Sequence, residues 1–353
     1  MISKPLGKEN LEKLSLLIEN SSNMVITCHV KPDGDAIGST LALMQVLSKL
    51  GKHVDIITPD SPPKYLRFLP GFKEIIHFSA KTDLASRLLE EADIIFCLDF
   101  NAAYRVDKMQ DTLLNSKAKK VLIDHHLDPE AFADITISSP PDSSTCLLIF
   151  KVLCQLGLRP LIEKPEATCI AAGMMTDTGN FSYNANDPEA YTVIAELLLT
   201  GIDKVAIWDK LNVRSEAQLR LNGFALSEKL KLISDDRASL IQLSKEELSS
   251  HNYQKGDLEG LVNVPLQIPE VEISVLMHEE ATFIKVSMRS QGKIPVNEIC
   301  EKYFGGGGHL NAAGGEFKGT LEEAAIILEN ILPDYYPYFR KKLSKEYHEA
   351  ENQ

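Results

Sequence analysis

The sequence predicts an α/β fold, with an N-terminal, mostly parallel sheet flanked by helices and a smaller C-terminal mixed α/β domain. Short apolar runs alternate with segments of helical periodicity in the first half of the chain, as in βαβ units. A second series of strands and helices begins near residue 235. The length of 353 residues also favours two domains, because a domain typically has roughly 150 residues. We expect domains at 1–200 and 235–340, joined by a helical connector at 201–234.

Individual elements are predicted from apolar runs that end in polar residues. The run 24–28 stops at the polar loop 29–35 (HVKPDGD), and Gly51 is typical of a helix C-cap. The predicted strands are 24–28, 54–57, 94–98, 121–123, 238–243, 271–278 and 282–289. The predicted helices are 9–20, 36–50, 143–156, 165–175, 187–200, 202–233, 295–303 and 320–331. The glycine run 305–308 predicts a flexible loop, and the polar tail after 340 is expected to fray.

Composition and charge exclude several classes of protein. The formal net charge of -13 argues against binding to duplex DNA, which depends on Lys and Arg contacts to phosphates. No apolar run approaches the ~18 residues that span a bilayer, and the N-terminus lacks the apolar region of a signal peptide. The six cysteines form no CxxC pair, which argues against a disulfide framework or a zinc knuckle. We expect a cytoplasmic protein with no membrane and no duplex DNA as partners.

Ionisable side chains follow three of the predicted strands at the point where each strand ends. They are His29, Asp33 and Asp35 after the first strand, Asp99 after the third, and Asp124, His125 and His126 after the fourth. In parallel sheets, ligands bind beyond the carboxyl ends of the strands. Taken alone, the loop 29–35 is more simply a polar turn in which an Asp caps the next helix. The small residues at 36–39 would let that helix begin close to a bound phosphate.

The carboxylates at these positions would repel one another in a cleft. Asp177, in the segment 173–180 (GMMTDTGN), joins Asp33, Asp35 and Asp99 to give a formal charge of about -4, which raises carboxylate pKa values. Two divalent cations offset this charge. For Asp177 alone, the start of an ordinary loop is the alternative. Mixed imidazole and carboxylate ligands suit manganese, with zinc, cobalt or iron as chemical alternatives.

These residues, taken in order, are similar to the four sequential motifs of the DHH family of phosphoesterases. The segment 305–315 (GGGGHLNAAGG) is similar to the signature of the DHH-associated domain, and 287–290 (SMRS) matches another motif of that domain. The resemblance extends from about residue 24 to residue 317, in order. It implies the same two-domain α/β architecture, with the active site in the cleft between the domains.

The resemblance implies a two-metal site. One ion would be held by His29, Asp33 and Asp99, and the other by Asp35, Asp99, His125 and Asp177, with Asp99 bridging. His126 would face the substrate phosphate, and Asp124 would orient His125. The family usually uses Mn²⁺. Two such ions about 3.5–4 Å apart would share a hydroxide that attacks phosphorus in line with the leaving oxygen. His126 would stabilise the developing charge or protonate the leaving group.

The resemblance also implies that the C-terminal domain grips the substrate. Arg289 would clamp a phosphate through two hydrogen bonds, and His309 would contact a phosphate or a base. The glycines would let backbone N–H groups approach a phosphate. The implied substrate-binding residues are Arg289, Ser290, Gly306, Gly307, Gly308 and His309, and Arg105 is a further candidate from its position after Asp99, with a surface salt bridge as its alternative. Phe181 and Tyr183 are candidates for stacking on a base, with core packing as the alternative for Phe181.

A chain of this two-domain length resembles the bifunctional oligoribonucleases of the family. The resemblance implies hydrolysis of short single-stranded RNA or linear dinucleotides such as pApA to mononucleotides, and of pAp (adenosine 3′,5′-bisphosphate) to AMP. The alternatives are a cyclic di-AMP phosphodiesterase, an exopolyphosphatase or pyrophosphatase, and an inactive nucleotide-binding regulator. Every ligand position is filled, which argues against the regulator. The helical connector is also a candidate surface for a homodimer, with internal packing as the alternative.

Overall fold

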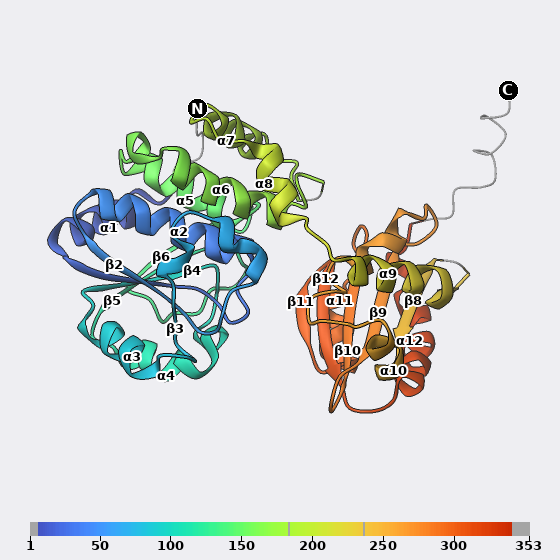
Figure 1. Ribbon diagram of the computed structural model, residues 1–353. Helices are drawn as coiled ribbons and strands as arrows, with labels where there is room; N and C mark the ends of the chain where they lie inside the picture. Colours follow the sequence, from blue (N-terminus) through green and yellow to red (C-terminus); the bar gives the residue numbers. More distant parts are fainter. Residues whose placement is uncertain (1–5, 183, 236, 341–353) are drawn as a thin grey trace, which may run out of the picture. The chain divides into compact units, whose positions relative to one another are not determined.

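The chain divides into two compact units, Met1–Val213 and Arg214–Gln353 (Figure 1). The computed structural model describes residues 6–182, 184–235 and 237–340. Tyr183, expected to stack on a base, and the tail after residue 340, expected to fray, lie outside the described residues. None of the described helices is both long enough and apolar enough to cross a membrane.

The first unit is built on a parallel sheet of six strands in the order β3-β2-β1-β4-β5-β6. The predicted parallel α/β sheet is therefore confirmed. Sequence patterns missed β3 and β6 because these strands are only two and four residues long. The strands are β1 (Asn23–Thr27), β2 (His53–Thr58), β3 (Ile76–His77), β4 (Ile94–Leu98), β5 (Lys119–Asp124) and β6 (Ile135–Ser138).

Helices cover both faces of this sheet, as Figure 1 shows. Side chains of β1 alternate between the two layers: Met24 and Ile26 join the larger core, whereas Val25 joins the smaller one. Burial on both faces explains why the strands are continuous apolar runs. The larger layer contains α1 (Lys8–Asn20), α2 (Gly34–Lys49), α5 (Thr145–Gln155), α6 (Lys164–Asp177), α7 (Pro188–Leu198) and α8 (Lys204–Leu211), and the smaller contains α3 (Thr82–Glu91) and α4 (Gln110–Asn115).

The strand order places a topological switch between β1 and β4. The chain leaves β1 toward β2 on one side, and it leaves β4 toward β5 on the other. A crevice opens at such a point beyond the carboxyl ends of the two strands. The loops that follow β1, β4 and β5 therefore converge at one edge of the sheet.

Helices α2 and α6 pack closely because glycines line their contact. A Cβ atom added to Gly38 would lie 2.5 Å from the carbonyl oxygen of Cys169, and one added to Gly173 would lie 2.8 Å from Asp35 Oδ1. The small residues at 36–39 are buried within the unit. The close approach brings the first turn of α2 beside the last turn of α6.

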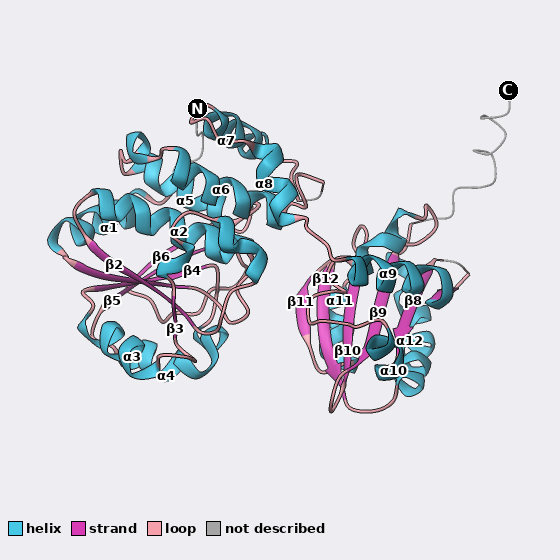
Figure 2. Ribbon diagram, in the orientation of Figure 1, coloured by secondary structure: helices cyan, strands magenta, loops and turns pink. Residues whose placement is uncertain are grey.

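The second unit has a mixed six-stranded sheet in the order β11-β12-β10-β9-β8-β7. Strands β8 and β9 pair in parallel, and the other neighbours are antiparallel. Figure 2 shows helices beside this sheet, and separate hydrophobic cores lie on its two faces. Its strands are β7 (Leu230–Ile233), β8 (Ala238–Leu243), β9 (Ile273–Glu279), β10 (Ile284–Ser290), β11 (Gly307–His309) and β12 (Ala312–Phe317), and its helices are α9 (Glu216–Phe224), α10 (Lys245–Ser250), α11 (Val296–Tyr303) and α12 (Leu321–Tyr335).

Two expectations for this region differ from the structure. The segment predicted as a helix over 202–233 contains α8, which belongs to the first unit, and α9, which belongs to the second. It ends in strand β7, whose pairing with β8 outweighs the local helical pattern. The glycine run is a loop only at 305–306, because 307–309 form strand β11 against β12. A Cβ atom at Gly308 would lie 2.5 Å from the carbonyl oxygen of Ala312, so glycine permits this close pairing.

Candidate metal centre

Six histidine and aspartate side chains predicted as metal ligands converge at the carboxyl edge of the first sheet. They come from four segments of the chain: 29–35, the residue after β4, the residue after β5, and the end of α6. His29 follows β1, Asp33 is the N-cap of α2, Asp35 lies in the first turn of α2, Asp99 follows β4, His125 follows β5, and Asp177 ends α6. The structure thus brings together all six residues, within the first unit alone.

One group consists of His29, Asp33 and Asp99, whose ligand atoms lie within 4.8 Å of one another. His29 Nε2 is 3.4 Å from Asp99 Oδ2, and His29 Nδ1 is 2.8 Å from the carbonyl oxygen of Val30. A neutral imidazole that donates from Nδ1 to that carbonyl leaves the lone pair of Nε2 free for a metal. Asp33 also caps α2 by accepting from the backbone N–H groups of Asp35 and Ala36, so the capping alternative is also correct.

A second group consists of Asp35, His125 and Asp177, again with ligand atoms within 4.8 Å of one another. His125 Nε2 is 3.3 Å from Asp177 Oδ2 and 3.6 Å from Asp99 Oδ1. His125 Nδ1 lies 3.2 Å from the carbonyl oxygen of Asp142, which again directs Nε2 toward the carboxylates. Asp99 contacts a histidine of each group and therefore lies between them.

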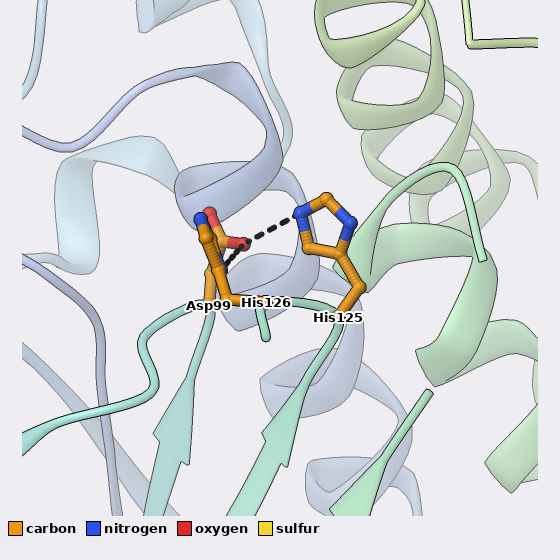
Figure 3. Close-up of side chains that lie close together, drawn as sticks. All are labelled: Asp99, His125 and His126. Carbon is orange, nitrogen blue, oxygen red and sulfur yellow. Dashed lines mark ion pairs between the residues drawn. The ribbon is translucent and has the colours of Figure 1, made fainter. Parts of the chain in front are cut away.

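Asp99 occupies a constrained position at the end of β4. Its φ is 65°, a left-handed conformation that is uncommon outside glycine, and its side chain is buried. Figure 3 shows Asp99 together with His125 and His126, which approach it from the end of the neighbouring strand. The surrounding fold thus holds a strained residue where two groups of ligands meet.

Asp124 pairs with His126, not with His125 as the family resemblance implied. Asp124 Oδ1 is 2.7 Å from His126 Nδ1, whereas the Nδ1 atom of His125 faces the backbone of Asp142. Asp124 is the last residue of β5, and its buried side chain reaches the second residue beyond it. His126 Nδ1 also lies 3.9 Å from Asp99 Oδ1. The pairing with Asp124 thus fixes the orientation of the His126 ring.

Burial and mutual charge shift the pKa values of this cluster. Burial, reinforced by the charges of Asp177 and Asp99, raises the pKa of Asp35 well above its ordinary value. Burial also raises the pKa of Asp177 to about 7. Burial opposes protonation of the histidines, but their bonds to Asp99 and Asp177 outweigh it and raise the pKa of His29 to about 9 and that of His125 to about 11. The metal-free cluster thus holds protons that a bound cation would displace.

The donor set fits two divalent cations. Each group offers one imidazole and at least one carboxylate, and the four carboxylates carry a formal charge of about -4 that two divalent ions offset. A second acidic cluster, Asp142, Asp187 and Glu189, differs in that the positively charged side chain of Lys151 already lies in it. The ammonium group of Lys151 is 2.8 Å from Asp142 Oδ1 and 3.0 Å from Glu189 Oε2.

Arg105 lies in the segment after β4, and this segment is hydrogen-bonded to the loop after β1. It belongs to a 3-10 helix, Ala103–Met109, and its carbonyl oxygen accepts a hydrogen bond from the backbone N–H of Val30 at 2.7 Å. Its Nε atom is buried and has no hydrogen-bond partner among the described residues. Phe181, by contrast, packs against the core, and its ring centroid lies 5.4 Å from that of Tyr191, which supports core packing over base stacking.

The substrate-binding candidates of the second unit lie on β10 and the β11–β12 hairpin. Arg289 and Ala312 face each other across β10 and β12, and His309 pairs with Ala312 from the other side. Ser290 was expected to bind substrate, but its hydroxyl makes hydrogen bonds within the protein. Its buried hydroxyl donates to the carbonyl of Ile294 at 2.7 Å and accepts from Asn311 Nδ2 at 2.9 Å, so it holds the loop after β10. The predicted Gly306, Gly307 and Gly308 lie beside these residues in the second unit.

Two residues that contact the ligands were missed by sequence reasoning. The carbonyl of Asp142 faces His125, and the hydroxyl of Thr145 donates to Asp99 Oδ1 at 2.8 Å. The available signal was the polar run 142–145 (DSST) before an apolar helix, which indicates a helix cap. Such a cap alone gives no reason to expect contact with Asp99, which is 46 residues from Thr145 in sequence.

Comparisons with known proteins support this description. Residues 23–174 match the DHH family N-terminal domain, and residues 240–332 match the DHHA1 domain. The bifunctional oligoribonuclease and PAP phosphatase NrnA of Thermus thermophilus is 32% identical to this chain over 302 residues. The match covers 85% of this chain and 86% of that protein.

Solved structures extend the comparison to the fold. The crystal structure of an exopolyphosphatase-related protein from Bacteroides fragilis is 46% identical, with a TM-score of 0.93 and coverage of 95% of this chain and 98% of that chain. The crystal structure of exonuclease RecJ bound to manganese is 16% identical, with a TM-score of 0.55 over 97% of this chain and 98% of that chain, and it supports the fold alone. The family expectation is confirmed: this chain belongs to the DHH family of metal-dependent phosphoesterases.

Proposed function

We propose that the chain is a Mn²⁺-dependent phosphodiesterase and phosphatase that hydrolyses short oligoribonucleotides or linear dinucleotides to mononucleotides, and pAp to AMP. The observation that carries the proposal is the convergence of two ligand groups that share Asp99. The likeness to NrnA of Thermus thermophilus, named as a bifunctional oligoribonuclease and PAP phosphatase, supports this choice of substrates.

The chain would hold two divalent ions through its six ligands. One would be bound by His29, Asp33 and Asp99, and the other by Asp35, Asp99, His125 and Asp177. When bound, such ions supply an activated water and stabilise negative charge on the phosphoryl oxygens. Imidazole and carboxylate donors suit Mn²⁺, and a RecJ structure of the same fold is described as bound to manganese.

His126 would act on the substrate and not as a metal ligand. Its Nδ1 is held by the buried carboxylate of Asp124, so the ring presents Nε2 in a fixed orientation. A histidine held in this way can donate a hydrogen bond to a phosphoryl oxygen or a proton to the leaving oxygen. The carboxylate would stabilise the imidazolium form during that step.

Arginine and histidine side chains would bind the remaining phosphates. Arg105 is the candidate of the first unit, because its buried Nε atom lacks a partner among the described residues and a phosphate oxygen would satisfy it. Arg289 and His309 are the candidates of the second unit, with Gly306, Gly307 and Gly308 lining the same hairpin. We propose that both units contribute substrate-binding side chains. An acidic chain with few such groups suits short substrates better than long nucleic acids.

The test is a substrate panel with metal-stripped protein. Protein treated with EDTA and then supplied with Mn²⁺ is incubated with pAp, pApA, a five-nucleotide RNA and cyclic di-AMP, and the products are separated by anion-exchange chromatography. We expect AMP from pAp and pApA, and none without added metal. Asp99→Asn is the matched control, because it keeps the size of the shared ligand and removes its charge. Absence of mononucleotide from pApA at saturating Mn²⁺ would contradict the proposal.

A second candidate is an exopolyphosphatase. It is favoured by one observation, the 46% identity to a structure described as exopolyphosphatase-related. The same panel distinguishes the two activities when polyphosphate is included. Release of orthophosphate from polyphosphate, with pApA left intact, would replace the oligoribonuclease proposal with this one.

A further inference from the structure

Thr145 is the residue through which helix α5 contacts both ligand groups. Its hydroxyl donates to Asp99 Oδ1 at 2.8 Å, and its backbone N–H donates to Asp35 Oδ2 at 2.6 Å. The backbone N–H of Cys146 donates to the other oxygen of Asp35 at 2.8 Å. All these groups are buried. Both oxygens of Asp35 and one oxygen of Asp99 therefore have their directions set by the first turn of α5.

A buried ion network fixes this turn in place. Lys151 lies on α5 and is only 1% exposed. Its ammonium group bridges Asp142, on the segment before the helix, and Glu189 on α7. Ser144 caps the helix through the backbone N–H of Leu147 at 3.0 Å. On the same segment, the carbonyl oxygen of Asp142 lies 3.2 Å from His125 Nδ1. The segment 142–151 thus contacts three of the six ligands. Its own position is fixed by the ion pair with Glu189 on α7.

We propose that Thr145 is a positioning residue of the metal centre, which orients the shared carboxylate of Asp99 and holds Asp35 against the repulsion of its neighbours. The inference rests on the metal centre of the proposed function. The hydroxyl of Thr145 donates to Oδ1 of Asp99, the oxygen that lies 3.6 Å from His125 Nε2. In this orientation Oδ2 faces His29 Nε2 at 3.4 Å. Without that hydrogen bond, the carboxylate can rotate and no longer serves both groups in one orientation.

A positioning role differs measurably from a purely structural one. Side chains that orient metal ligands without touching the metal typically change metal affinity or activity by about 10–100-fold when they are removed. Thr145→Val keeps the shape of the side chain and both backbone N–H donors, and it removes only the hydroxyl. We expect Mn²⁺ binding to weaken by about 10-fold or more. Thr145→Ser restores the hydroxyl and should restore the affinity.

The experiment measures Mn²⁺ binding to metal-stripped full-length protein by isothermal titration calorimetry, with the melting temperature of each metal-free variant as a check on folding. Ser143→Ala is the matched control. Ser143 lies two residues away and is equally buried, but its hydroxyl has no hydrogen-bond partner among the described residues. We expect wild-type affinity for Ser143→Ala and Thr145→Ser, and weakened affinity for Thr145→Val alone. A steady-state assay should show a higher Mn²⁺ concentration for half-maximal rate in Thr145→Val, with the rate recovering at saturation.

The outcomes separate this inference from the proposed function. If wild-type protein binds two Mn²⁺ ions and Thr145→Val binds them equally well, the positioning role is wrong and the metal centre stands. If wild-type protein binds no Mn²⁺, the metal centre itself fails. If Thr145→Val and Ser143→Ala lose affinity to the same extent as their melting temperatures fall, the hydroxyl has only a structural role and the inference is overturned.

Discussion

His126 and its partner Asp124 provide the sharpest test of the proposed chemistry at the scale of single residues. His126 is a neighbour of Asp99, but its Nδ1 is already held by Asp124 at 2.7 Å. We expect His126→Ala to reduce the turnover of pApA by roughly 10²–10⁴-fold, the range typical of a lost general acid or base. Because His126 is not proposed as a ligand, bound Mn²⁺ measured by mass spectrometry should stay at two ions per chain.

Asp124→Asn tests the corrected pairing. An amide at this position removes the charge that stabilises the imidazolium form of His126, while His125 keeps its bond to the carbonyl of Asp142. We therefore expect lower turnover with unchanged Mn²⁺ affinity. Lost Mn²⁺ affinity would instead indicate that Asp124 acts through His125, as the sequence first suggested.

The pKa values of the cluster predict how the metal-free protein responds to pH. The pKa of Asp177 is raised from 3.8 to about 7 and that of His29 from 6.5 to about 9, so the folded state holds protons that the unfolded chain releases. Stability therefore falls as pH rises, between about 4 and 7 through Asp177 and between 6.5 and about 9 through His29.

Melting temperatures between pH 6.5 and 9 check this expectation. In EDTA the melting temperature should fall across this range, and His29→Gln should flatten the slope. With Mn²⁺ present, the stabilisation by metal should grow with pH, because binding displaces those protons. A melting temperature in EDTA that is constant or rises over the range would contradict the assigned protonation.

At the scale of elements, the ion network of α5 is expected to matter for stability as well as for position. Lys151 is buried and its ammonium contacts Asp142 and Glu189. Removing one partner of a buried pair leaves an uncompensated charge and costs about 3–5 kcal/mol. We expect Lys151→Met to lower the free energy of unfolding by that amount, measured by urea denaturation of the metal-free protein.

An exposed pair in the same unit is the control for that measurement. Lys13 Nζ is 2.7 Å from Glu9 Oε1 on the surface of α1, at a comparable distance but in solvent. Lys13→Met should change the free energy of unfolding by less than about 1 kcal/mol. Equal effects of the two substitutions would show that the Lys151 network is no more important than a surface pair.

The elements also show what could be predicted from the sequence. The strands ending at Leu98 and Asp124 were recognisable because burial on both faces makes them continuous apolar runs. Strand β7 was assigned to a helix, since its pairing with β8 depends on a segment that its own residues do not reveal. Gly307 and Gly308 were assigned to a loop, because the close approach of β12 that requires glycine is a tertiary contact.

The ligand set followed the same logic. Strand ends place His29, Asp99 and His125 together, because a parallel sheet aligns its carboxyl edge, and this could be inferred before any coordinates. Thr145 and the carbonyl of Asp142 could not be inferred, since their role depends on how α5 packs beside the cluster. The partner of Asp124 likewise depends on side-chain direction beyond the end of β5, which sequence spacing leaves undetermined.

At the scale of the whole molecule, the two units divide the proposed work. All six proposed ligands lie in Met1–Val213, whereas Arg289 and His309 lie in Arg214–Gln353. Each unit also has hydrophobic cores of its own. We therefore expect the first unit alone to fold and to bind Mn²⁺ with the affinity of the full chain, as measured by circular dichroism and calorimetry.

Hydrolysis, unlike Mn²⁺ binding, should be weaker in the isolated first unit than in the full chain. A phosphate clamp of hydrogen bonds to charged groups is worth about 1.5–3 kcal/mol, so its loss should reduce kcat/KM for pApA at least about 10-fold. The linked chain keeps the second unit at an effective concentration of about millimolar, so the second unit added in trans should restore activity only near that concentration. If the first unit alone hydrolysed pApA as fast as the full chain, Arg289 and His309 would have no part in binding this substrate.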